Sequence, residues 1–65
     1  MQVDIYDVEQ LGPGETIHVR GIDLREALGE DAGEYDRLAA EIAAHGETMY
    51  GGGASPLYRI VPVRN

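Results

Sequence analysis

Apolar and polar residues alternate along the first third of the chain with the two-residue period of a β-strand. In QVDIYDV the apolar residues Val3 and Ile5 share one face. In TIHVR the same alternation predicts that Ile17 and Val19 share a face, with the polar residues on the other. The turn-forming sequence Gly12-Pro13-Gly14 separates the two runs. The pattern predicts an antiparallel hairpin with a connection longer than a tight turn.

Two helix starts are expected next, because an acid is followed three residues later by glutamate in two places. Asp23 with Glu26 and Asp31 with Glu34 both match a capping box. The first start predicts a helix of one or two turns over residues 24–28, which needs tertiary packing to persist.

A longer helix is predicted by a change to helical periodicity. Tyr35, Leu38, Ala39 and Ile42 follow the spacing i, i+3, i+4, i+7 and form one apolar stripe. Gly46 is placed to end this helix.

The chain closes with the strand signal LYRIVPV, and TMY before the GGGASP loop predicts a second hairpin with it. Pro62 cannot donate to a ladder, so we expect it at a sheet edge or outside the sheet. The fold class predicted is α+β: a small antiparallel sheet of three to four strands packed on one short and one longer helix, in the order ββααβ. Residues 1–65 form a single domain.

Charge excludes several classes of partner. The net charge is −7, and the five cations are all arginines. Direct nucleic-acid binding needs clustered Lys or Arg, and an anionic membrane surface would repel this chain. The sequence has no cysteine, no apolar run long enough to span a bilayer and no signal-peptide pattern. We therefore expect a soluble, cytoplasmic protein, a monomer or dimer, whose partner is a basic protein.

Motifs for catalysis, metal or cofactor binding are weak. Gly51-Gly52-Gly53 follows a helix and precedes a strand, and the chain lacks the lysine of a P-loop. His18 and His45 are not in a ligand spacing and are expected to be surface residues, His18 on the polar face of its strand. A chain this small rarely encloses the pocket that acid/base catalysis needs. We expect no enzyme activity, no cofactor and no metal site.

Acidic residues are concentrated in residues 23–41, where seven acids and two arginines give a net charge of −5. Helix caps and a solvated helix face explain part of this concentration of acids. One helix edge also carries charges that partly cancel, since it holds Glu34, Arg37 and Glu41. Alternatively, the carboxylates imitate nucleic-acid phosphates, which in duplex DNA supply about one charge per 1.7 Å. The candidate partner-binding residues are Asp23, Glu26, Glu30, Asp31, Glu34, Asp36 and Glu41.

The whole chain resembles the small acidic anti-CRISPR proteins of phages and mobile elements, and in particular those acting on the type I-C system. The likeness covers the opening MQVDIYDV, the acidic DLREALGEDAGEYDRL and the ending GGGASPLYRIVPV. The resemblance implies a non-enzymatic inhibitor that binds a basic Cas subunit of the surveillance complex and blocks target-DNA binding. It carries over no catalytic residue, because these inhibitors share no common functional positions.

Two other interpretations remain open at this point. A small regulatory or structural interaction module, antitoxin-like or a virion accessory protein, would use the apolar strand LYRIVPV or the alanine-rich helix face. A halophile domain would be acidic for solvation alone.

Overall fold

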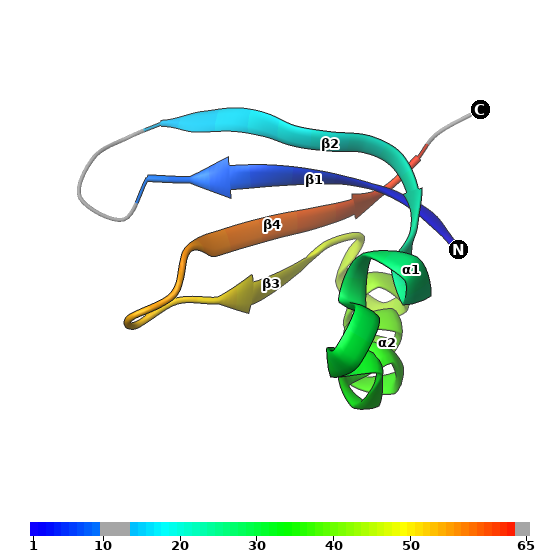
Figure 1. Ribbon diagram of the computed structural model, residues 1–65. Helices are drawn as coiled ribbons and strands as arrows, with labels where there is room; N and C mark the ends of the chain where they lie inside the picture. The colour runs from blue at the N-terminus through cyan, green and yellow to red at the C-terminus, as the bar shows by residue number, and fades with distance from the viewer. Residues whose placement is uncertain (10–13, 64–65) are drawn as a thin grey trace.

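The chain forms a four-stranded antiparallel sheet and a helical segment that packs on one of its faces (Figure 1). The computed structural model describes residues 1–9 and 14–63. The predicted α+β class and element order are confirmed. The extra element is one short strand that precedes the last strand. The elements are β1 (Gln2–Val8), β2 (Glu15–Asp23), α1 (Leu24–Leu28), the 3₁₀ helix η1 (Gly29–Glu34), α2 (Tyr35–His45), β3 (Thr48–Gly51) and β4 (Leu57–Pro62).

Both predicted hairpins are present, and they join through their inner strands. The strand order is β2-β1-β4-β3, so β1 and β4 are central while β2 and β3 are edges. The turn predicted at Gly12-Pro13-Gly14 lies, apart from Gly14, outside the described residues.

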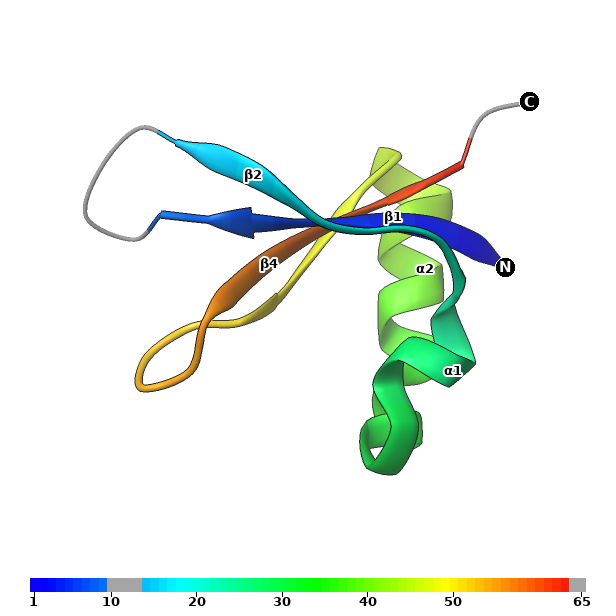
Figure 2. The same cartoon turned by 45° about the horizontal axis from the view of Figure 1, so that its top comes forward.

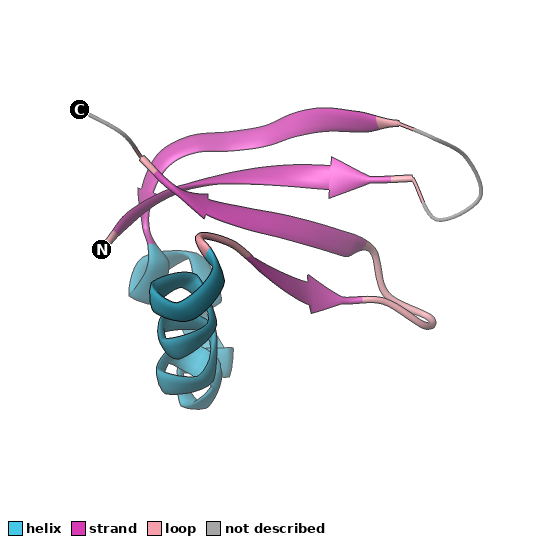
Figure 3. Ribbon diagram, turned by 180° about the vertical axis from the view of Figure 1, so that it is seen from behind, coloured by secondary structure: helices cyan, strands magenta, loops and turns pink. Residues whose placement is uncertain are grey.

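The helices cover only part of one face of the sheet. They lie beneath the end where β1 begins and β4 finishes, and the two hairpins extend well beyond them (Figures 1 and 3). Turning the molecule shows α1 and α2 side by side on this one face (Figure 2). We call the covered side the helix face and the other side the open face.

A small apolar core lies between the helices and the sheet. The predicted stripe on α2 is confirmed, because Leu38 and Ile42 are buried while Tyr35 and Ala39 are half-buried. These side chains meet α1 and the central strands. The buried apolar residues are Val3, Ile5, Leu24, Leu28, Leu38, Ile42 and Ile60.

The Asp23 half of the first predicted capping box is confirmed, whereas the Glu26 side chain makes no return hydrogen bond within the described residues. The Asp23 carboxylate accepts hydrogen bonds from the backbone N–H groups of Arg25 (3.1 Å) and Glu26 (3.4 Å) at the start of α1. It also contacts the N-terminal amine at 3.1 Å, and this bond lowers the pKa of Asp23 below its ordinary value. The predicted helix end at Gly46 is confirmed as well, since its left-handed backbone (φ 84°) closes α2 with an N–H bond to Ile42.

The second predicted cap is wrong. Asp31 lies inside η1 with φ −91° and ψ 25°, and Glu34 precedes α2 without making a side-chain cap. The reason is that η1 runs directly into α2, so that the Tyr35 N–H donates to the Ala32 carbonyl. Backbone acceptors of η1 thus take the place of a capping side chain.

The predicted faces of β2 are also wrong. The β1–β2 register shifts on both sides of Ile5, and such bulges break the two-residue alternation. Val19 lies opposite Ile5 and packs against the core, whereas Ile17 lies opposite Tyr6 and is 41% exposed. His18, expected on the polar face, lies on the helix face beside Tyr58.

Pro62 occupies the kind of position that the sequence predicts. The last β3–β4 pair is Thr48 with Ile60, and Val63 donates its N–H to Gln2 on the β1 side. Because successive residues of a strand alternate in direction, the Pro62 nitrogen points to the side where β3 has already ended. Its missing N–H therefore costs the ladder no hydrogen bond.

The β3–β4 turn gives a stability test. Gly51 has φ 92°, and a Cβ there would lie 2.1 Å from the Pro56 carbonyl oxygen, whereas a Cβ at Gly53 (φ 62°) meets nothing within 4 Å. We expect Gly53→Ala to cost about 1 kcal/mol of unfolding free energy from backbone strain alone. Gly51→Ala should cost more than about 2 kcal/mol, because the clash adds to that strain. Urea unfolding of both variants measures this, and equal losses would contradict the described turn.

Candidate functional site

The predicted acidic residues gather in the helical segment. Six of the seven lie in residues 24–45, which we call the acidic helical layer, and Asp23 lies at its start. With two arginines, Arg25 and Arg37, this layer has a net charge of −4. All of it lies on one side of the sheet (Figure 1).

Some of these acids are occupied within the protein. Arg37 forms ion pairs with Glu34 (3.3 Å) and Glu41 (3.3 Å), which confirms the predicted helix edge. The hydrogen bond to Glu34 is the main cause that raises the pKa of Arg37. Asp31 accepts a hydrogen bond from the Tyr50 hydroxyl, and this bond raises the pKa of Tyr50.

Glu41 connects the helical layer to the sheet. It accepts a hydrogen bond from the hydroxyl of Thr48, the buried first residue of β3. That bond, together with the charge of Arg37, lowers the pKa of Glu41. The sequence pattern predicted the Arg37 contact of Glu41 but not this one, because Thr48 lies seven residues away and on another element.

Three of the predicted acids remain free for a partner. Glu26, Glu30 and Asp36 are exposed, and their side chains make no hydrogen bond or ion pair with residues 1–9 or 14–63. Arg25 lies near them in sequence, but its guanidinium stacks over the Tyr35 ring at 4.0 Å.

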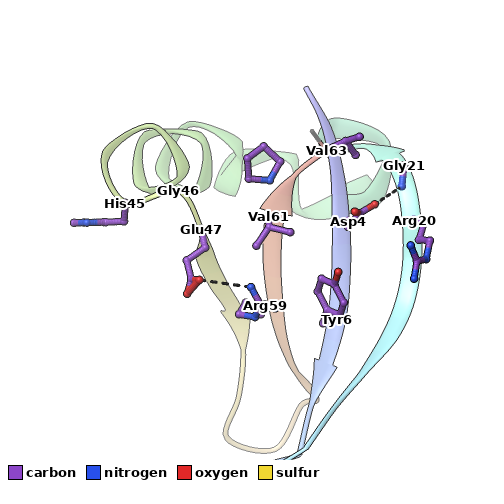
Figure 4. Close-up of a pocket in the computed structure, with 11 residues that line it drawn as sticks. Asp4, Tyr6, Arg20, Gly21, His45, Gly46, Glu47, Arg59, Val61 and Val63 are labelled. Atoms are coloured by element: carbon purple, nitrogen blue, oxygen red, sulfur yellow. Dashed lines mark hydrogen bonds and ion pairs between the residues drawn. The ribbon is translucent and has the colours of Figure 1, made fainter. Parts of the chain in front are cut away.

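Two arginines, Arg20 and Arg59, lie on the open face together with the acids Asp4, Glu15 and Glu47. Arg59 of β4 pairs with Glu15 (2.6 Å) and Glu47 (3.5 Å), and its guanidinium lies 4.8 Å from the centre of the Tyr6 ring. The bond to Glu15 is the main cause that raises the pKa of Arg59. Figure 4 shows Arg59 beside Tyr6, with Arg20 on the neighbouring edge strand. These residues line an open depression of about 930 Å³.

A second, smaller pocket lies on the helix face, where α1 meets the sheet. Its volume is about 160 Å³, and we call it the corner pocket. Its floor consists of core side chains, Ile5, Leu24, Leu28 and Ile60. Sequence patterns did not reveal it, because its residues come from five elements.

The rim of the corner pocket is formed by three side chains that contain aromatic rings and by one exposed alanine. They are His18, Tyr50, Tyr58 and Ala27. His18 Nδ1 lies 3.2 Å from Asp7 Oδ2, and its ring centre lies 5.0 Å from that of Tyr58. The side chains of His18 and Asp7 are 49% and 42% exposed, so this pair lacks the desolvated setting of a catalytic dyad.

Within the part of the chain that the structure describes, no group of three His, Asp or Glu side chains is placed to hold a metal ion. No helix in that part is long and apolar enough to cross a bilayer. No protein-family model, curated protein or solved structure matches the chain.

The Glu41–Thr48 contact predicts a pH-dependent contribution to stability. Because the pKa of Glu41 is lowered on folding, its contribution is present above the ordinary glutamate pKa of 4.5 and is lost as pH falls through the lowered value. We expect Thr48→Val to reduce the unfolding free energy at pH 7 and to cost less at pH 3. Urea unfolding at both pH values measures this. The control is Thr16→Val at an exposed position of β2, which should show no such difference. An equal cost of Thr48→Val at both pH values would contradict the prediction.

Proposed function

We propose that this protein is a non-enzymatic inhibitor that uses its acidic helical layer to bind a basic, nucleic-acid-binding surface of another protein. The proposed target is a Cas subunit of a type I CRISPR surveillance complex, in the cytoplasm of the host cell. Occupying that surface with carboxylates would block the binding of target DNA.

The free acids of the helical layer carry this proposal. Glu26, Glu30 and Asp36 are exposed and unpaired within the described residues, while Arg37 is held by carboxylates of its own helix. The layer therefore presents uncompensated negative charge to solvent. The cations Arg20 and Arg59 lie on the other side of the sheet, where they do not weaken this field at short range.

A basic groove that normally holds nucleic acid fits this surface. Such a groove gains affinity for DNA by replacing phosphate counterions with Lys and Arg. Carboxylates on the acidic helical layer offer the same groups a sparser set of anions, and charge attraction of this kind speeds association and weakens with salt. The resemblance to small acidic anti-CRISPR proteins supports the type I-C surveillance complex as the target.

A regulatory or structural interaction module is the alternative function. The structure weakens one form of it, because β4, which contains LYRIVP, already has a neighbour on each side and offers no free edge for pairing. Its other forms would use the exposed alanines of α2 or the open face, where Ile17 (41% exposed) and Met49 (40% exposed) are available.

The test is binding of charge-reversed variants to a purified type I-C surveillance complex. We expect the triple variant Glu26→Lys, Glu30→Lys, Asp36→Lys to lose at least about a hundredfold in affinity, because three charge contacts become repulsive. Target DNA should compete with the wild-type protein for the complex. Biolayer interferometry at two salt concentrations measures both effects.

The matched control compares Asp36→Lys with Glu9→Lys. Both replace an exposed acid that has no side-chain partner in the described chain, and both change the net charge equally, but Glu9 follows β1, outside the acidic helical layer. We expect Asp36→Lys to weaken binding more than Glu9→Lys. Binding by the triple variant with unchanged affinity, or equal effects of the two single variants, would contradict a role for this layer.

A further inference from the structure

The corner pocket is a place where the apolar core reaches the surface. Its floor residues Ile5, Leu24 and Ile60 are 7%, 0% and 1% exposed, so the pocket lies directly above the core. It is lined by residues of α1 and of all four strands, on the face where the two hairpins extend beyond the helices (Figure 1).

The size and lining of the corner pocket favour one particular kind of occupant. A water molecule takes about 30 Å³ of liquid volume, so about 160 Å³ holds a few waters or one large aliphatic side chain. Waters need polar partners, and the floor is formed by Ile, Leu and no polar side chain. An aliphatic side chain would replace that water and bury apolar surface on both sides.

The charges beside the pocket define what should flank that side chain. Asp7 contacts the rim residue His18, and Asp31 accepts a hydrogen bond from the rim residue Tyr50. His18 belongs to β2 and Tyr50 to β3, which are the two edges of the sheet. A carboxylate therefore lies on each side of the corner pocket, and both favour a positively charged neighbour.

We propose that the corner pocket receives one large aliphatic side chain of a basic protein segment, and that Lys or Arg residues beside this anchor pair with Asp7 and Asp31. The inference rests on the proposed function, from which it takes a basic protein as the partner. Anchors of this kind, seated in a desolvated pocket and surrounded by polar contacts, commonly dominate the affinity of an interface. Charge would then guide the encounter, and the pocket would select the segment.

Two synthetic peptides test the anchor directly on the intact protein. They are the capped sequences Lys-Arg-Leu-Arg-Lys and Lys-Arg-Ala-Arg-Lys, which differ only in the proposed anchor. Because the leucine buries about three more carbons, we expect it to bind about tenfold more tightly, allowing for incomplete burial. In an NMR titration the methyl groups of Ile5, Leu24, Leu28 and Ile60 should shift with the leucine peptide and shift little with the alanine peptide.

A matched pair of variants tests the location. Ala27→Met extends a side chain from the exposed rim into the pocket, whereas Ala43→Met makes the same change at an exposed alanine of α2 that does not line it. We expect the tenfold preference for the leucine peptide to disappear in Ala27→Met and to persist in Ala43→Met. The peptide pair on the wild-type protein keeps the test valid if Ala27→Met fails to fold.

The outcomes separate this inference from the proposed function. Equal affinity for the two peptides, no binding by either, or a preference that persists in Ala27→Met would overturn the anchor pocket. If the surveillance complex binds through Glu26, Glu30 and Asp36 while the peptides are not distinguished, the proposed function stands and the pocket is wrong. If the leucine peptide binds in the pocket while the complex does not bind, the pocket stands and the proposed target is wrong.

Discussion

The structure depends on one packing constraint: among the described residues, only a short helical segment covers the sheet, and it must supply about half of the core. Leu24, Leu38 and Ile42 pack against the central strands, and burial of such side chains is the main favourable term in a chain with no cysteine. In a domain this small, one helical layer can cover only part of one face. The open face and the corner pocket beside α1 are both consistent with that partial cover.

The same constraint decides where the charges lie. The large aliphatic residues of this segment, Leu24, Leu28, Leu38 and Ile42, turn inward, so its acids must turn outward or find partners. Arg37 forms ion pairs with Glu34 and Glu41, and Thr48 donates a hydrogen bond to Glu41. Tyr50 donates a hydrogen bond to Asp31. What remains free is a smaller set than the sequence suggests, and it lies on one side of the sheet.

Local patterns predicted those parts of the fold that local forces determine. The α2 stripe, the Asp23 cap and the Gly46 helix end were all correct, because each depends on residues within a few positions of one another. The cap at Asp31 and the faces of β2 were wrong. A 3₁₀ connection supplied backbone acceptors in the first case, and register shifts at β-bulges changed side-chain direction in the second.

The candidate surfaces were less predictable than the fold, because their contacts join distant parts of the chain. The Arg59 ion pairs and the corner pocket bring together residues from several strands and helices, and no sequence spacing encodes them. The concentration of acid in residues 23–41 was visible in the sequence, but which acids are free was not. Glu41, suspected as a partner contact, is bound to Arg37 and Thr48.

Carbodiimide labelling of carboxylates, read by mass spectrometry with and without the type I-C surveillance complex, tests the central claim most directly. It reports each acid separately, without altering the charge of the protein before binding. The account predicts strong protection of Glu26, Glu30 and Asp36 in the complex, with Glu15 and Glu47 on the open face labelled as in the free protein. Protection of Glu15 and Glu47, with Glu26, Glu30 and Asp36 still labelled, would show that the protein binds through its other side.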